Sequence, residues 1–81
     1  MSYTYILKSL IKEKFYVGST DNLERRMKEH NSGLSYYTKR YMPWRLLYKE
    51  KYNNIIDARK REKYFKSAAG RRFTKKLIIP G

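Results

Sequence analysis

The stretch that decides the fold of this chain reads FYVGSTDNLERR and spans residues 15–26. Its first part, residues 15–19, is rich in aromatic and β-branched residues and predicts a strand. Its second part predicts a helix, because Asp21 is a favourable N-cap and Glu24, three residues later, completes a pattern like a capping box. The chain is therefore expected to pass directly from a strand into a helix.

The rest of the sequence predicts a small antiparallel sheet covered by helices. A strand over residues 3–8 lies so close to residues 15–19 that the two are expected to form a hairpin, since a parallel pair needs a longer crossover. The other predicted elements are the helix to about His30 with its cap at Asn31 to Gly33, a loop over 34–43, a strand over 44–52, helices over 55–66 and 71–78 separated by a break at 67–70, and a short tail at Pro80 and Gly81. The order β-β-α-β-α-α predicts one α+β domain over residues 1–81, a three-stranded antiparallel sheet flanked by helices.

Charge is the strongest compositional signal. The chain has 20 lysines and arginines against seven acidic residues, and its formal net charge is +13. Such a domain is attracted to polyanions, of which nucleic acid is the usual example. A solvated basic surface and a ribosome-associated protein are the alternatives. An anionic membrane surface is disfavoured, because the basic residues are spread along the chain and form no single amphipathic helix.

Several kinds of protein are excluded or disfavoured by features that the sequence lacks. The chain has no cysteine, which excludes a disulfide framework and a thiolate metal site. It has no secretory apolar segment and no apolar run of about 18 residues, so we expect no membrane association and a cytoplasmic location. A monomer and a weak dimer both remain open.

Glu62 occupies an unusual place in the predicted helix over residues 55–66. It falls on the same stripe as Ile55, Ala58 and Phe65, which are expected to face the core. An ionised carboxylate on an apolar stripe is costly unless it is paired or bound to a metal. A salt bridge to a nearby Lys or Arg is one interpretation. The other is a ligand for a hard cation such as Mg²⁺, which prefers oxygen donors.

Arg26 lies beside the expected buried stripe of the first helix, which Leu23 and Met27 mark by their four-residue spacing. An arginine at a half-buried edge is suited to binding a phosphoryl group as charge builds on it. The alternative is a surface ion pair with Glu29 or Glu24, which would contribute little to stability.

Two further residues give weaker signals. His30 is the only histidine, and a lone histidine without cysteine partners makes no zinc site and is more often structural. Gly18 within a strand indicates a close backbone approach or a bend.

Basic and aromatic residues alternate in the predicted loop. Interleaved Tyr and Lys or Arg side chains are able to stack on bases and pair with phosphates, although a single Tyr is more often part of a core. Lys39 and Arg40 in this loop, together with the solvated Arg25, are the predicted contacts to nucleic acid.

These residues, taken together, resemble the GIY-YIG nuclease superfamily. Tyr16-Val17-Gly18 matches the YIG element, and Tyr3-Thr4-Tyr5 takes the place of GIY. Residues 16–26, followed by His30-Asn31-Ser32-Gly33, look like the family's core, and residues 58–66 resemble its later helix that carries a glutamate. The likeness covers residues 3–78 and is greatest to short stand-alone bacterial members related to the N-terminal nuclease module of the DNA-repair excinuclease.

The resemblance implies roles for the matched positions. Tyr5 and Tyr16 take the places of the motif tyrosines, one of which helps to activate the attacking water. Arg26 takes the catalytic arginine position, His30 matches a histidine found in many members, and Glu62 matches the metal-binding glutamate. The implied activity is a Mg²⁺- or Mn²⁺-dependent endonuclease acting on DNA.

One position departs from the family pattern. Tyr3 stands where the family has the first glycine of GIY, a change expected to alter packing only. The sequence leaves two functions open: an endonuclease, and a nucleic-acid-binding module with little or no turnover.

Overall fold

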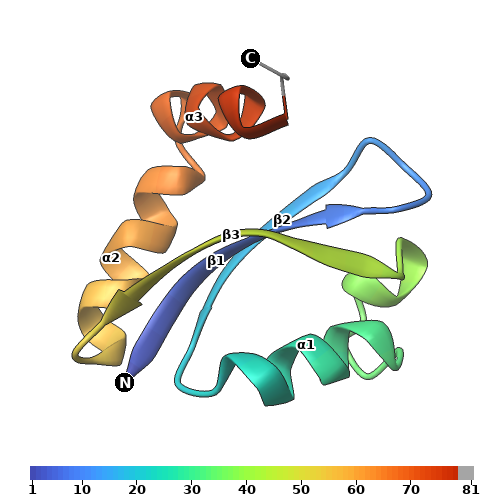
Figure 1. Cartoon of the computed structure of the whole chain (residues 1–81), viewed down its shortest axis with the longest axis horizontal. Helices are drawn as coiled ribbons and strands as arrows, with labels where there is room; N and C mark the ends of the chain where they lie inside the picture. The colour runs from blue at the N-terminus through green and yellow to red at the C-terminus, as the bar shows by residue number, and fades with distance from the viewer. Residues whose placement is uncertain (79–81) are drawn as a thin grey trace.

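The computed structural model describes residues 1–78 of the chain, so the expected tail at Pro80 and Gly81 lies outside the described residues (Figure 1). The α+β fold with a three-stranded sheet is confirmed. Its elements are β1 (Ser2–Ser9), β2 (Phe15–Thr20), α1 (Leu23–Asn31), a short 3₁₀ helix η1 (Thr38–Arg40), β3 (Trp44–Tyr52), α2 (Ile55–Phe65) and α3 (Ala68–Ile78).

The sheet has the strand order β2-β1-β3, with both pairs antiparallel. Tyr5 of the central strand pairs with Gly18 of β2 on one side and with Lys49 of β3 on the other. A register shift between Ile6 and Leu7 interrupts the ladder with β3. Because β1 is hydrogen-bonded along both edges, its residues are the most buried of the sheet.

Helices cover both faces of this sheet (Figure 1). On one face, Tyr5, Leu7 and Trp44 form a buried cluster against which Leu23 and Met27 of α1 pack. On the other face, α2 lies across the strands. The hydroxyl of Thr4 donates to the backbone oxygen of Ala58 at 2.6 Å, and the buried Phe65 ring packs beside Tyr48 of β3. The sheet therefore has a small hydrophobic core on each face, one under α1 and one under α2.

The start of α1 corrects the sequence-based prediction. Asn22, not Asp21, is the N-cap, and its side chain accepts from the backbone N–H of Arg25 at 3.0 Å. The hydroxyl oxygen of Thr20 accepts from the N–H of Asn22 at 3.1 Å, and this turn delays the helix by one residue. Glu24 forms no capping box and instead pairs with Lys28 on the surface at 3.7 Å.

The break expected at residues 67–70 is also wrong in part, because α3 begins at Ala68. The Ser67 hydroxyl oxygen accepts from the N–H of Gly70 at 3.3 Å and so caps the first turn. Gly70 serves packing and does not end a helix: a Cβ there would overlap the backbone of Phe65. No helix within residues 1–78 is long and apolar enough to cross a membrane.

Candidate functional site

The site forms where β2 has no side chain. At Gly18, an added Cβ would lie 2.6 Å from the Tyr5 hydroxyl oxygen and 2.9 Å from the Tyr16 ring. The close approach predicted at this glycine is confirmed. Because Gly18 has no Cβ, the Tyr5 side chain lies directly against the backbone of β2, with its ring 6.2 Å from that of Tyr16.

His30 anchors the Tyr5 hydroxyl from α1. The imidazole is fully buried, and its Nε2 lies 2.9 Å from the Tyr5 oxygen while its Nδ1 lies 2.8 Å from the Thr38 hydroxyl. The Tyr16 ring packs 4.8 Å from it. Burial, reinforced by the nearby charge of Arg26, lowers the pKa of His30 to about 4, so the ring is neutral at neutral pH.

Arg26 faces the same two tyrosines. Burial raises the pKa of Tyr5 to about 12, an effect that the Arg26 guanidinium opposes. The guanidinium also forms an ion pair with Glu29 at 2.9 Å, and its side chain is 32% exposed. The surface pairing considered as an alternative is therefore present, and the same guanidinium lies within electrostatic range of Tyr5.

Glu62 approaches from α2 on the other face of the sheet. Ser19 of β2 donates its hydroxyl to Oε1 at 2.6 Å, and Lys66 donates to Oε2 at 2.6 Å. The salt bridge that the sequence left open is thus observed. The charge of Glu62 contributes to the raised pKa of Tyr5, which places the carboxylate within electrostatic range of the tyrosine cluster.

The donor set fits one kind of metal site. Within residues 1–78, no group of three or more His, Cys, Asp or Glu side chains converges on one point. Mg²⁺ does not require such a group, because it is often held by one or two carboxylates together with water and substrate phosphate. A half-buried carboxylate with a hydroxyl beside it, as Glu62 has in Ser19, meets that requirement.

The predicted nucleic-acid contacts lie around this centre rather than in it. Arg25 is exposed, pairs with Asp21 at 3.3 Å, and lines with Arg26 a polar groove of about 510 Å³. Lys39 and Arg40 lie on η1, with their cationic groups 5.3 and 5.5 Å from the ring of Tyr36.

The sequence-based reasoning missed two residues that position the site. Ser19 follows the glycine of β2 by one residue, so strand alternation could have placed it on the face opposite to Tyr16 and toward Glu62. Thr38 gave no comparable signal, because it lies in a segment without periodicity. It is fully buried, and besides contacting His30 it accepts at its backbone oxygen from the Trp44 indole at 2.8 Å.

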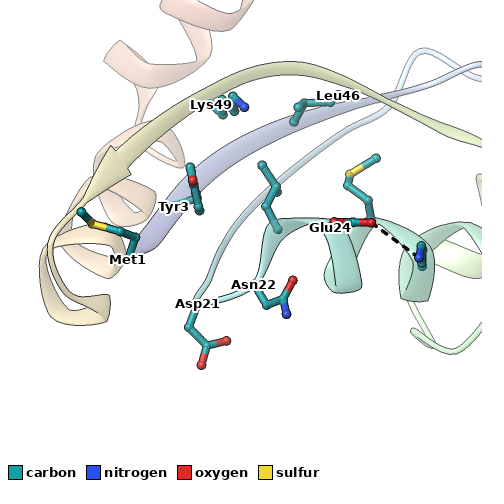
Figure 2. A pocket seen from close by; sticks show the side chains of 10 residues that line it. Met1, Tyr3, Asp21, Asn22, Glu24, Leu46 and Lys49 are labelled. Carbon is teal, nitrogen blue, oxygen red and sulfur yellow. Dashed lines mark ion pairs between the residues drawn. The ribbon is translucent and has the colours of Figure 1, made fainter.

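Tyr3, the departure from the GIY pattern, lies away from this centre. Figure 2 shows it in a groove between α1 and the sheet, close to Lys49 and to Met1, which precedes β1. The Lys49 ammonium lies 5.8 Å from the centre of its ring. The larger side chain therefore packs in the groove beneath α1, while Tyr5, two residues on, extends toward β2.

Comparisons with known proteins identify relatives of this chain. Residues 1–76 match the family model described as the GIY-YIG catalytic domain. A UPF0213 protein of Clostridium perfringens is 45% identical over 67 residues, which are 82% of this chain and 71% of that protein. The structure-specific endonuclease subunit SLX1 of Debaryomyces hansenii is 42% identical over 50 residues, which are 53% of this chain and 14% of that protein. The solution structure of a UPF0213 protein of Bacillus halodurans superposes with a TM-score of 0.55 at 29% identity and covers 96% of this chain and 86% of that one.

Proposed function

The chain belongs to the GIY-YIG nuclease family, and from that premise we propose that it is a divalent-cation-dependent endonuclease that hydrolyses phosphodiester bonds in DNA. The observation that carries the proposal is the convergence at Gly18. Two tyrosines, an arginine and a neutral histidine meet at the edge of β2, and a carboxylate stands behind the same strand. Nucleic acid as the substrate is also supported by the net charge of +13.

Glu62 would hold the cation. A bound Mg²⁺ supplies positive charge that polarises the scissile phosphate and stabilises the leaving oxygen. The Ser19 hydroxyl orients the carboxylate by its hydrogen bond to one oxygen. Lys66 is 57% exposed and holds the other oxygen by a surface ion pair, so its long side chain can swing away when a cation binds.

The remaining residues would act on the phosphate and the attacking water. Arg26 would bind the phosphoryl oxygens and stabilise the charge that grows on them in the transition state. The hydroxyls of Tyr5 and Tyr16 would hold the water. With a pKa of about 12, Tyr5 is protonated at neutral pH and acts as a positioning group rather than as a free base. His30 fixes the orientation of this phenol through Nε2.

Plasmid nicking tests the proposal. We expect the wild-type protein to convert supercoiled plasmid to open circles with Mg²⁺ or Mn²⁺ and not with EDTA. Arg26→Ala should reduce the rate by about a hundredfold or more, the usual cost of losing one group that stabilises transition-state charge. Arg45→Ala is the matched control, because Arg45 is exposed on β3 and its loss changes the net charge equally.

The assay also separates the two functions that the sequence left open. Nicking that is equal in the wild type and in Arg26→Ala would contradict the proposed enzyme and point to a contaminating nuclease. Retained binding to DNA without any metal-dependent nicking would favour a nucleic-acid-binding module.

A further inference from the structure

A second groove begins at the site and runs toward α3. It has a volume of about 680 Å³ and is bounded by the start of β2, the segment before η1, the end of α2 and one face of α3. Its lining includes Lys14, Phe15, Tyr16, Tyr37, Arg71 and Lys75. We refer to it as the aromatic–basic groove.

The chemistry of the aromatic–basic groove differs from that of the polar groove on the other side of the site. The polar groove is lined by Arg25, Arg26 and Arg59 among hydroxyl and acidic side chains, and none of its lining residues within the described chain is aromatic. The aromatic–basic groove combines aromatic rings with four basic side chains and one acidic one among the described residues. The first suits a phosphate backbone, whereas the second also offers surfaces on which bases stack.

A row of aromatic rings connects the aromatic–basic groove to the site. The Tyr16 ring lies 6.2 Å from that of Tyr5 and 6.1 Å from that of Tyr37, and Tyr41 follows 5.6 Å beyond Tyr37. Tyr37 is 49% exposed, so one surface of its side chain is available to a ligand. A nucleotide beside the scissile phosphate would reach this ring directly from the catalytic tyrosines.

Basic residues flank the rings on the far side of the groove. Arg71 and Lys75 are one helical turn apart on α3, so both lie along the same edge. Lys14 lies at the opposite end, with its ammonium 5.8 Å from the Tyr41 ring. Basic side chains beside a row of aromatic rings suit a single strand, in which phosphates alternate with bases.

We propose that the aromatic–basic groove binds an unpaired strand of DNA next to the scissile phosphate, with Tyr37 as the base-stacking residue and Arg71 and Lys75 as phosphate contacts. The bases of a duplex stack on one another and offer their faces only where pairing ends, so the groove selects unpaired over fully paired DNA. This inference rests on the proposed function for the position of the cut, but the binding itself needs neither metal nor catalysis.

Binding in EDTA tests the groove independently of cleavage. The probe is a labelled deoxyoligonucleotide of about 12 nucleotides, either alone or annealed to its complement, and the readout is fluorescence anisotropy. We expect the wild type to prefer the unpaired strand. Tyr37→Ala should weaken binding of the unpaired strand by about tenfold and that of the duplex far less, while Tyr37→Phe should keep the wild-type affinity because stacking needs only the ring.

Matched controls isolate the groove from general charge and exposure. Tyr64→Ala removes a tyrosine of similar exposure, 41%, that lines a different hollow beside Arg61, and should leave the affinity unchanged. Arg71→Ala should reduce the slope of log K against log salt for single strands by about 0.7. Arg72→Ala removes the same charge from the neighbouring position, which does not line the groove, and should not change the slope. The arginine pair also tests the proposal if Tyr37→Ala proves unfolded by circular dichroism.

Equal losses for Tyr37→Ala and Tyr64→Ala, or for unpaired and paired probes, would overturn the groove proposal. The outcome for the nuclease is separate. If the protein nicks DNA in a metal-dependent way but Tyr37→Ala binds DNA as well as the wild type, the proposed nuclease activity is supported and the groove proposal is wrong. If Tyr37 is needed for selective binding of the unpaired strand but no nicking occurs, the groove proposal is supported and the proposed nuclease activity is wrong.

Discussion

Two glutamates on the same face of the sheet are almost equally exposed, yet their carboxylates differ in the number and kind of hydrogen-bond partners. Glu50 of β3 has a side chain 20% exposed and Glu62 of α2 one that is 22% exposed. The two contacts start from neighbouring positions of α2, since Arg61 reaches Glu50 on β3 while Glu62 itself reaches Ser19 on β2. Helix α2 thus carries a structural contact toward one edge strand and a candidate catalytic group toward the other.

The difference lies in how completely each carboxylate is bound. Glu50 accepts from the hydroxyls of Tyr48 and Tyr52 at 2.6 and 2.7 Å, and from two nitrogens of Arg61 at 2.8 and 3.3 Å. Burial alone would raise the pKa of Glu50, but these hydrogen bonds outweigh it and hold the pKa below its usual value. Glu62 has one hydroxyl and one flexible ammonium as partners. A fully hydrogen-bonded carboxylate has no oxygen lone pairs left for a cation, whereas one with an exchangeable partner does.

Glu62→Gln is expected to have the largest effect in this comparison. Loss of the charged oxygen should reduce metal-dependent nicking by about a thousandfold or more, because the cation would lose its protein ligand. The midpoint of urea unfolding should barely change, since the amide keeps a hydrogen-bonding oxygen for Ser19. Plasmid nicking and urea unfolding of the same preparation measure both.

Glu50→Gln is the matched control for that experiment. It makes the same chemical change to an equally exposed glutamate, but it should preserve nicking at temperatures where the variant is folded. If both variants lost activity to the same degree, the functional distinction between the two glutamates would be wrong.

The same contrast shows what the sequence could predict. Glu62 stood out because helical periodicity placed a charge between Ala58 and Phe65, and both of these are buried in the structure. Periodicity could not say whether the partner would be Lys66, a metal, or both. The strand and helix boundaries were predicted to within a few residues, because capping and alternation are local properties. Thr38 could not be found, since its role comes from a tertiary contact between an irregular loop and α1.

Unfolding measured at acidic pH should distinguish the contribution of His30 to stability from that of Glu50. The pKa of His30, about 4, is below the unfolded value of about 6.5, so between these pH values the unfolded chain binds more protons. Stability should be complete above about pH 6.5 and should fall by about 3 kcal/mol as the pH drops to 4. Urea unfolding across this range measures the loss, and His30→Gln should flatten it.

Glu50 contributes to stability in a lower pH window. Its pKa is depressed on folding, so its contribution is present above the ordinary carboxylate range and is lost as the pH falls below that range. Glu50→Gln should therefore leave the slope between pH 6.5 and 4.5 intact. A variant that removed this slope as well would show that Glu50, and not His30, causes it.

At neutral pH, Glu50→Gln is expected to lower the free energy of unfolding by about 2 kcal/mol. The amide keeps the shape of the side chain but leaves the Arg61 guanidinium without its counter-charge and confronts it with an NH₂ group. The cost is moderated by the partial exposure of both groups. Urea unfolding at pH 7 measures it, and a loss no larger than that of Glu62→Gln would contradict the structural role assigned to this carboxylate.

The smallest expected effect comes from the cation that pairs with Glu62. Lys66 is 57% exposed and bridges an i,i+4 pair, so Lys66→Ala should change the free energy of unfolding by less than about 0.5 kcal/mol. Arg61→Ala is the counterpart, and it should cost more, because Arg61 makes two hydrogen bonds to Glu50 and stacks on Tyr64 and Phe65 at 4.5 and 4.6 Å. Thermal and urea unfolding of the two alanine variants compare them directly. A loss in Lys66→Ala as large as that in Arg61→Ala would mean that Lys66 is a fixed structural partner of Glu62, and a fixed partner would leave that carboxylate unable to accept a cation.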